Sequence, residues 1–292
     1  MRLRAAGAAF EVTFLDTLHA LLFAVLQGAT ELFPVSSLGH AVIVPALLHW
    51  PINLAAPGFL PFLVMLHVGT ATALLIYFRA DWLAMLAGFF GRSGAAENAV
   101  QRGLIARLIV ATVPAVIVGF TLKKPLAHLF ANPLAASVFL AANAGLLWLG
   151  EALRRAATRR AEQLSYLDAV VIGLYQCLAF LPGISRSGAT IVGGLSRGIS
   201  HESAARFTFL MGTPVIFAAA VLEVPKLVHG HLLHALFGPA LLAALAAGIV
   251  AYASTAFLMR YFRNHDVWAL SPFAWYCLVA GGLSAIAFGF GW

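Results

Sequence analysis

Six long apolar runs constrain the fold of this chain more than any other feature. They lie near 60–78, 104–122, 134–150, 207–224, 235–257 and 270–290. Each is about as long as the roughly 17–25 residues that a helix needs to cross a bilayer. With 62% hydrophobic and only 10% charged residues, the composition excludes the ordinary soluble classes. The sequence predicts an all-α polytopic membrane protein with six transmembrane helices.

Two further apolar regions, 14–56 and 166–200, are interrupted in their middles by glycine, proline, serine and ionisable residues. The two interruptions resemble each other, which indicates an internal repeat. The first reads Gln27-x-x-x-Glu31-Leu-Phe-Pro34-Val-Ser36-Ser37, and the second reads Gln176-x-x-x-Phe180-Leu-Pro182-Gly-Ile-Ser185-Arg186-Ser187. Irregular backbone is tolerated at membrane depth only where protein or water surrounds it. We therefore expect each region to form a re-entrant helical hairpin.

Each expected hairpin is followed by three of the apolar runs, so we interpret the chain as one membrane domain, 1–292, built from two repeats. Repeat one covers about 14–150 and repeat two about 166–290. Because three is an odd number of spans, the two repeats must have opposite orientation. Inverted repeats of this kind place a site near the bilayer midplane, where the two broken segments meet.

The arginines lie mainly in three connecting segments, 79–103, 151–165 and 258–269, which alternating spans place on one side of the membrane. The positive-inside rule makes that side cytoplasmic and puts both termini outside. The formal net charge of +7 does not indicate nucleic-acid binding, because the basic residues lie in short clusters between apolar runs. Cys177 and Cys277 lie in apolar stretches without metal-ligand spacing, so we expect neither a disulfide framework nor a zinc site.

Glu31 differs from most of the other carboxylates, which lie at loops or span ends. Holding a charged side chain at membrane depth costs on the order of 2.5–3.5 kcal/mol, so such a residue faces a partner or a cavity. Gln27 lies about one helical turn earlier and shares the same face. The alternative is a protonated or snorkelling glutamate at the end of the hairpin.

Ser36, Ser37 and His40 follow the break that Pro34 makes in the first hairpin. If a new helix begins near Ser36, then Ser37 and His40 are three residues apart on it and project the same way. A hydroxyl beside an imidazole is a base-activated nucleophile. Ser36 is the expected N-cap of the new helix. The alternative for His40 is an ordinary packing residue in an apolar helix.

The second hairpin carries a candidate phosphate site. The turn at Pro182 and Gly183 leads to a helix start, where the backbone N–H groups of 185–188 are exposed. Free amides at a helix N-terminus beside an arginine bind phosphate, and Arg186 offers a planar fork of donors for bidentate contact. The alternative is a structural ion pair between Arg186 and Glu31.

Other polar residues in the apolar runs carry less weight. His67 in the first span could line a cavity, and Asn143 in the third span is expected only to hydrogen-bond a neighbouring helix. His201, Glu202 and Arg206 are expected to form a solvated helix start after the second hairpin.

The two motifs resemble those of the undecaprenyl-diphosphatase family, the integral-membrane phosphatases that recycle the bacterial cell-wall lipid carrier and confer bacitracin resistance. Members show Glu/Gln-x-x-x-Glu running into Pro-Val-Ser-Ser-x-Gly-His, and later Pro-Gly-x-Ser-Arg-Ser-Gly-x-Thr. In this chain the motifs stand at Gln27 to His40 and at Pro182 to Thr190. The resemblance covers nearly the whole chain, including the segments 107–120 and 202–214.

The resemblance implies six spans, two re-entrant hairpins in inverted repeats, and roles for individual residues. It implies that Ser37 is the nucleophile, His40 its acid/base partner, Glu31 a base or metal ligand, and Arg186 the diphosphate clamp. It implies substrate contacts from Gln27, Ser36, Ser185, Ser187 and Thr190. A divalent cation, Mg²⁺ or Ca²⁺, is expected in the family. Many members carry glutamate where this chain has Gln27, and an amide holds a hard cation less strongly than a carboxylate does.

The expected reaction is hydrolysis of the terminal phosphoanhydride of undecaprenyl diphosphate, or a similar polyprenyl diphosphate, in peptidoglycan biosynthesis. The products are the monophosphate and inorganic phosphate. The expected location is the bacterial inner membrane, with the termini and the site facing the periplasm, and a homodimer is a candidate assembly.

The alternative function is a lipid-phosphate transporter or flippase that uses the same midplane site. The pairing of Ser37 with His40 favours catalysis, because transport needs no nucleophile. A purely structural membrane subunit is a third alternative, and it leaves Glu31 and Arg186 at membrane depth unexplained.

Overall fold

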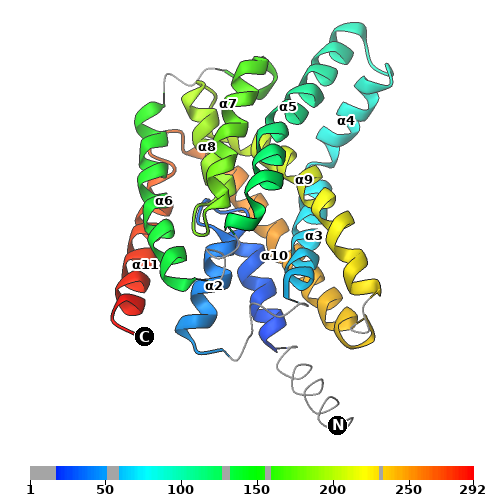
Figure 1. Cartoon of the computed structure of the whole chain (residues 1–292). Helices are drawn as coiled ribbons and strands as arrows, with labels where there is room; N and C mark the ends of the chain where they lie inside the picture. The colour runs from blue at the N-terminus through cyan, green and yellow to red at the C-terminus, as the bar shows by residue number, and fades with distance from the viewer. Residues whose placement is uncertain (1–17, 51–58, 127–131, 155–158, 230–232) are drawn as a thin grey trace.

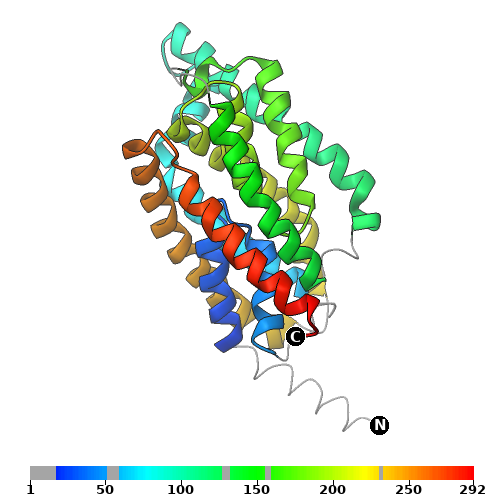
Figure 2. The same ribbon diagram turned by 90° about the vertical axis from the view of Figure 1, so that its left-hand side faces the viewer.

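The computed structural model describes residues 18–50, 59–126, 132–154, 159–229 and 233–292. Helices account for nearly all the regular structure in these ranges, and no strand belongs to a sheet within them. The fold is an elongated bundle of helices, and both views show its long helices running between the same two ends (Figure 1 and Figure 2).

Repeat one begins with a helix over Leu18–Thr30, which turns back through residues 31–35 into α2, Ser37–Leu47. The remaining helices of this repeat are α3, Phe59–Tyr77; α4, Arg79–Phe89; α5, Ala95–Leu126; and α6, Pro133–Leu153. After η1, Ala161–Gln163, the segment predicted as repeat two contains α7, Tyr166–Cys177; η2, Leu178–Phe180; α8, Arg186–Ser196; α9, His201–His229; α10, Leu233–Asn264; and α11, Ser271–Gly289. It also begins with two helices joined by a sharp turn, α7 and α8.

Five of the described helices are long and apolar enough to cross a membrane, which confirms the prediction of an all-α polytopic membrane protein. They are α5, α6, α9, α10 and α11. A sixth span arises if α3 and α4, which meet at an angle of 73°, are taken as one broken span. Six spans therefore agree with the prediction, although the first is bent.

The boundaries near the bend differ from those expected. Residues 79–103 were expected to connect two spans, but they contain α4, and α5 begins at Ala95 rather than near 104. The first turns of α5 are polar and exposed, yet they are helical, and Gln101 donates a hydrogen bond of 2.6 Å to Glu97 one turn earlier. Helix propensity and such i,i+4 pairs extend a helix beyond its apolar part, which hydropathy alone does not reveal.

Two helix pairs with a sharp turn between them approach from opposite ends of the bundle, and their turns meet midway (Figure 1). One is the Leu18–Thr30 helix with α2, and the other is α7 with α8. Gly39 and Gly183 lie at the contact between them, where a Cβ on Gly39 would come within 2.9 Å of the Gly183 Cα. Gly183 also has φ of +106°, a conformation that only glycine adopts without strain.

Asn143 of α6 joins the two turns. Its Nδ2 donates to the Pro34 carbonyl at 2.9 Å, and its Oδ1 accepts from the Ser185 backbone N–H at 3.0 Å. Because Asn143 is fully buried, these bonds form away from water and fix one turn against the other. The expectation that Asn143 bonds to one neighbouring helix understated its role, because it contacts both hairpins.

Ion pairs link the elements at the end of the bundle where the arginine-rich segments lie. Asp168 accepts from Arg159 at 2.9 Å and from Arg197 at 2.6 Å, so it ties together the two ends of the second hairpin. Arg206 of α9 pairs with Asp81 of α4 and with Glu162 of η1. Ion pairs therefore link the second hairpin to its flanking segments, and α9 to α4 and η1, at this end of the bundle.

The expectation of a solvated helix start at His201 is wrong. His201 is completely buried, and its two ring nitrogens lie 3.0 Å from Glu151 Oε1 and 3.1 Å from Asp266 Oδ1. Charged residues at a helix start predict exposure to solvent. The prediction fails because Glu151 and Asp266, which are distant in the sequence, contact the imidazole.

Candidate active site

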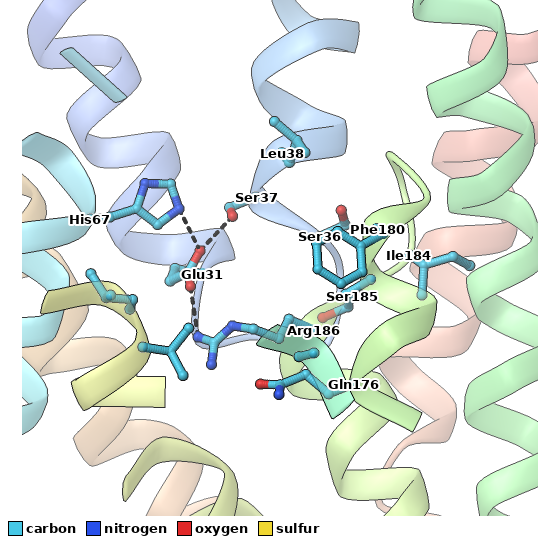
Figure 3. Close-up of a pocket in the computed structure, with 14 residues that line it drawn as sticks. Glu31, Ser36, Ser37, Leu38, His67, Gln176, Phe180, Ile184, Ser185 and Arg186 are labelled. Atoms are coloured by element: carbon cyan, nitrogen blue, oxygen red, sulfur yellow. Dashed lines mark hydrogen bonds and ion pairs between the residues drawn. The ribbon is translucent and has the colours of Figure 1, made fainter. Parts of the chain in front are cut away.

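Glu31 is the centre of a buried cluster at the meeting point of the two hairpins (Figure 3). Its Oε1 lies 2.8 Å from Nη2 of Arg186. Its Oε2 lies 2.6 Å from Oγ of Ser37 and 3.4 Å from Nε2 of His67. The four side chains come from four places in the fold: the first turn, α8, α2 and α3. Glu31 is therefore paired at depth and does not snorkel to a surface.

Ser37 and Glu31 have the geometry of a nucleophile and its base. The Ser37 hydroxyl donates to Glu31 Oε2 at 2.6 Å, which is short for a neutral donor and usual for a hydroxyl bonded to a carboxylate. A base within this distance can accept the hydroxyl proton as the oxygen attacks. Gln27 steadies the same carboxylate, since its Nε2 donates to Oε2 at 3.1 Å.

His40 does not contact Ser37, so the structure does not form the pair expected from their spacing. Its Nδ1 lies 2.7 Å from the Ser36 carbonyl and its Nε2 lies 2.7 Å from the Tyr276 hydroxyl. A carbonyl only accepts, so Nδ1 carries the proton and Nε2 accepts from Tyr276. The imidazole also stacks on the Tyr276 ring. Residues three apart on a helix share a face, but the His40 ring points toward Tyr276 of α11, Ser271–Gly289, and not toward Ser37.

Ser36 is the N-cap of α2, as the sequence predicted. Its side chain accepts from the Gly39 backbone N–H at 3.2 Å. Its φ of +70° is uncommon for a residue with a side chain and is strained. The bond from His40 to the Ser36 carbonyl holds this strained residue in place, and Ser36 in turn fixes the start of the helix that carries Ser37.

Arg186 is the first residue of α8, with Ser185 as the N-cap. One guanidinium nitrogen, Nη2, pairs with Glu31, and the other, Nη1, is buried and has no hydrogen-bond partner within the part of the chain that the structure describes. Gly212 of α9 makes room for this group, because a Cβ there would collide with the guanidinium. The structure therefore agrees with both hypotheses for Arg186: it forms the ion pair with Glu31, and its Nη1 group is available to donate to an anion.

The hydroxyl groups of the second motif bond mainly within the protein. Ser187 donates to the Phe33 carbonyl at 3.1 Å, and Thr190 donates to the Arg186 carbonyl at 2.8 Å. Ser185 caps Gly188, and its own backbone N–H bonds to Asn143. Of Ser185, Ser187 and Thr190, only Ser185 lines the cavity described below. The backbone amides that were expected to be free are thus partly hydrogen-bonded within the protein. The Arg186 guanidinium is therefore the clearer anion-binding feature of this motif.

A cavity of about 240 Å³ opens beside the cluster. Its polar lining residues are Glu31, Ser36, Ser37, His67, Gln176, Ser185 and Arg186. Its apolar lining residues are Leu38, Ala115, Ala179, Phe180, Ile184, Val215 and Ile216. A cavity lined by both charged and apolar residues suits a ligand with an anionic head group and a hydrocarbon tail.

His67 and Gln176 are cavity residues that the sequence predictions gave little or no weight. His67 Nδ1 lies 2.8 Å from the Leu63 carbonyl, an acceptor, and its Nε2 faces the Glu31 carboxylate, also an acceptor. A doubly protonated imidazole satisfies both contacts. The available signals were a histidine in an otherwise apolar span and a glutamine that occupies the position of Gln27 in the second repeat.

The cavity residues do not make a ligand set for a hard divalent cation. Glu31 is the only carboxylate among them, and both its oxygens already contact cationic or hydroxyl groups. Gln27 directs its N–H group, not its oxygen, at Glu31. Among the described residues, no three His, Cys, Asp or Glu side chains gather to hold a metal. Ca²⁺ and Mg²⁺ take six or more oxygen ligands, several of them usually from carboxylates or water.

Comparison with known proteins identifies the family. Residues 20–283 match the profile of the family described as bacitracin resistance protein BacA. The chain belongs to the BacA family. This membership confirms the resemblance found in the two hairpin motifs, and it extends that resemblance over nearly the whole chain.

Several proteins similar to this chain are named undecaprenyl-diphosphatase. The undecaprenyl-diphosphatase of Acidiphilium cryptum is 65% identical over 281 residues, which cover 94% of this chain and 99% of the relative. That of Granulibacter bethesdensis is 53% identical, covering 94% and 97%. Undecaprenyl-diphosphatase 2 of Chromobacterium violaceum is 50% identical, covering 91% and 97%. The chain therefore spans almost the full length of these relatives.

Proposed function

We propose that this chain hydrolyses the terminal phosphoanhydride of undecaprenyl diphosphate and releases undecaprenyl phosphate and inorganic phosphate. The observation that carries the proposal is the bond between Ser37 and Glu31 beside Arg186, at a cavity lined by both charged and apolar residues. The substrate is the one in the names of the relatives, whose sequences align along nearly all of this chain.

In the first step, Ser37 Oγ forms a bond to the terminal phosphorus, and the bond from that phosphorus to the bridging oxygen breaks. The bridging oxygen keeps the electron pair and leaves as part of undecaprenyl phosphate, while the Ser37 proton moves to Glu31. Arg186 and the protonated His67 stabilise the negative charge on the phosphoryl oxygens.

In the second step, water attacks the phosphoserine and the bond from phosphorus to Oγ breaks. Glu31 returns its proton to Ser37 Oγ, and the proton of the attacking water passes to a phosphate oxygen. The enzyme is thereby restored. A direct attack by water held by Ser37 is the competing route, and it forms no phosphoserine.

The apolar lining residues of the cavity, which include Leu38, Phe180 and Ile216, suit the first prenyl units of the lipid, while the charged cluster suits the diphosphate. We propose that the remaining tail lies between helices in the bilayer. Because the tail lies in hydrocarbon before it binds as well as after, its burial between helices adds little, and the polar groups of the cluster supply most of the head-group binding.

We further propose that the two hairpins are re-entrant, that the chain is one domain in the bacterial inner membrane, and that the site faces the periplasm. The positive-inside rule supports this orientation, because the arginine-rich segments lie at the end where α4 meets α5. No observation favours the transport alternative, since the relatives described above are named phosphatases.

Phosphate release from purified protein tests the proposal. We expect wild-type protein in detergent to release phosphate from undecaprenyl diphosphate, and Ser37→Ala to lose activity by about 10³-fold or more while keeping its melting temperature. A wild-type protein without phosphate release would overturn the function. Full activity in Ser37→Ala would overturn the assignment of the nucleophile.

A further inference from the structure

Gln176 is a buried glutamine whose side chain has no hydrogen-bond partner among the described residues. It is 3% exposed, and both Nε2 and Oε1 are unpaired. It lines the same cavity as Ser37 and Arg186. Leaving a buried polar group unpaired is costly, so native proteins rarely do so without a ligand or water to complete the bonds.

The inverted repeat explains why this amide is free. In repeat one, Gln27 donates to Glu31, which lies four residues later. Gln176 occupies the equivalent position in repeat two, but the residue four positions later is Phe180. An i,i+4 partner with an acceptor oxygen is therefore present in one copy and missing in the other. The glutamine of repeat two keeps both its donor and its acceptor for something else.

The free amide lies near a second unpaired group. Nη1 of Arg186 is also buried and has no partner in the described ranges, and Figure 3 shows Gln176 and Arg186 reaching toward the same space. Phosphoryl oxygens accept hydrogen bonds from amide and guanidinium N–H groups alike. The amide oxygen can accept from a protonated phosphoryl oxygen or from a water beside it.

We propose that Gln176 is a substrate-binding residue that donates its Nε2–H to the diphosphate head group beside Arg186 Nη1. The inference rests on the proposed function for the identity of the lipid, and it adds a contact from α7 to those of α2 and α8. In this arrangement repeat one supplies the nucleophile, its base and His67, and repeat two adds Arg186 and Gln176 as donors to the phosphates.

The test compares Gln176→Leu and Gln176→Met with wild type. Leucine and methionine remove the amide but keep much of its volume. We expect kcat/KM to fall about 10-fold or more, mainly through a higher KM, which is the usual effect of losing a hydrogen bond to a charged group. We also expect the melting temperature to stay the same or rise, because an unpaired buried amide is removed. A structural role predicts a lower melting temperature with an unchanged KM.

Thr208→Val is the matched control. Thr208 is also fully buried, its side-chain oxygen has no hydrogen-bond partner among the residues described, and it is not one of the residues that line the cavity. We expect its KM to equal that of wild type. If Thr208→Val raises KM as much as Gln176→Leu does, the effect is general and the proposal is wrong.

A binding measurement separates this inference from the proposed function. We expect inorganic pyrophosphate to raise the melting temperature of wild type and of Thr208→Val, but to shift Gln176→Leu and Gln176→Met by less than half as much. Equal shifts in all four proteins would overturn the role of Gln176, whether or not the chain turns over the lipid. If wild type does not hydrolyse undecaprenyl diphosphate, the proposed function is wrong, whatever the pyrophosphate shifts are.

Discussion

Glu31 concentrates most of the chemistry of this protein in one side chain. It accepts from a hydroxyl, a guanidinium and an amide, and it faces an imidazole. A lone carboxylate in a buried site is costly, whereas one surrounded by donors and cations stays ionised and fixed in direction. The residue can therefore act as a base for Ser37 without first having to reorganise.

The residue scale also shows where sequence reasoning reached its limit. The sequence identifies Glu31, Ser37 and Arg186 because a charge or a motif at membrane depth is unusual, and the structure brings all three together. It does not predict the partner of His40, because Tyr276 lies 236 residues away and tertiary contacts decide the direction of a side chain.

We predict that His40 acts by positioning the hairpin rather than by transferring a proton. His40→Ala removes the bond that holds the strained Ser36, so the melting temperature should fall together with kcat. The loss in kcat should be below the 10²–10⁴-fold that removal of a general base causes. Thermal unfolding and initial rates check this. A loss as large as that of Ser37→Ala, with an unchanged melting temperature, would instead make His40 a catalytic base.

A second prediction concerns the cation. Because the described cavity residues offer one carboxylate, already paired with Arg186, we expect phosphate release to persist in the presence of a chelator. Gln27→Glu would place a second carboxylate beside Glu31, so we expect it to lose activity in chelator and to regain it with Ca²⁺ or Mg²⁺. Initial rates of phosphate release by wild type and Gln27→Glu, measured with and without chelator, test this prediction. Wild-type activity that chelator abolishes and cation restores would contradict this account.

At the scale of elements, the site exists because two broken helix pairs meet turn to turn. Proline and serine in the sequence predict both breaks, and the structure places Ser36 and Ser185 as N-caps of the two helices that follow. The sequence does not reveal what holds the turns together. That role belongs to Asn143, a single polar residue in a span whose function depends on which helices surround it.

We expect Asn143→Ala to weaken this junction. It would leave the Pro34 carbonyl and the Ser185 N–H unpaired in the interior, at a cost of about 2–4 kcal/mol in the free energy of unfolding. Denaturant unfolding in detergent measures the change. Asn98→Ala is the control, because the Asn98 side chain bonds to the backbone of nearby Ser93 at the arginine-rich end and should matter less. Equal effects of the two variants would argue against the junction.

At the scale of the whole molecule, the repeats interlock rather than lie apart. Helix α3 of repeat one packs against α9 and α10 of repeat two, and α6 packs against α11 (Figure 2). The sequence predicts opposite orientation of the two repeats from the odd number of apolar runs after each hairpin, and this orientation stays a prediction. The sequence does not predict the bend between α3 and α4, because no proline stands at the break. The homodimer stays a prediction.

Orientation in the membrane is a prediction at this scale. Leu48 follows the last residue of α2 and Ala96 lies in the first turn of α5, and both are exposed. These two helix ends lie at opposite ends of the bundle (Figure 1), so Leu48→Cys and Ala96→Cys, in a background with Cys177 and Cys277 changed to alanine, place one thiol at each end. We expect a membrane-impermeant maleimide to label Leu48→Cys in cells with a permeabilised outer membrane. It should label Ala96→Cys only after the inner membrane is opened. The reverse pattern would place the site on the cytoplasmic side.

The central claim is that Glu31 and Ser37 act as one unit on the diphosphate. The direct measurement is the rate of phosphate release from undecaprenyl diphosphate by wild type, Glu31→Gln, Ser37→Ala and the double variant. Residues that act in the same step are not additive, so the account predicts that the double variant is no slower than the slower single variant. Losses that multiply in the double variant would show that the two residues act independently, and would contradict it.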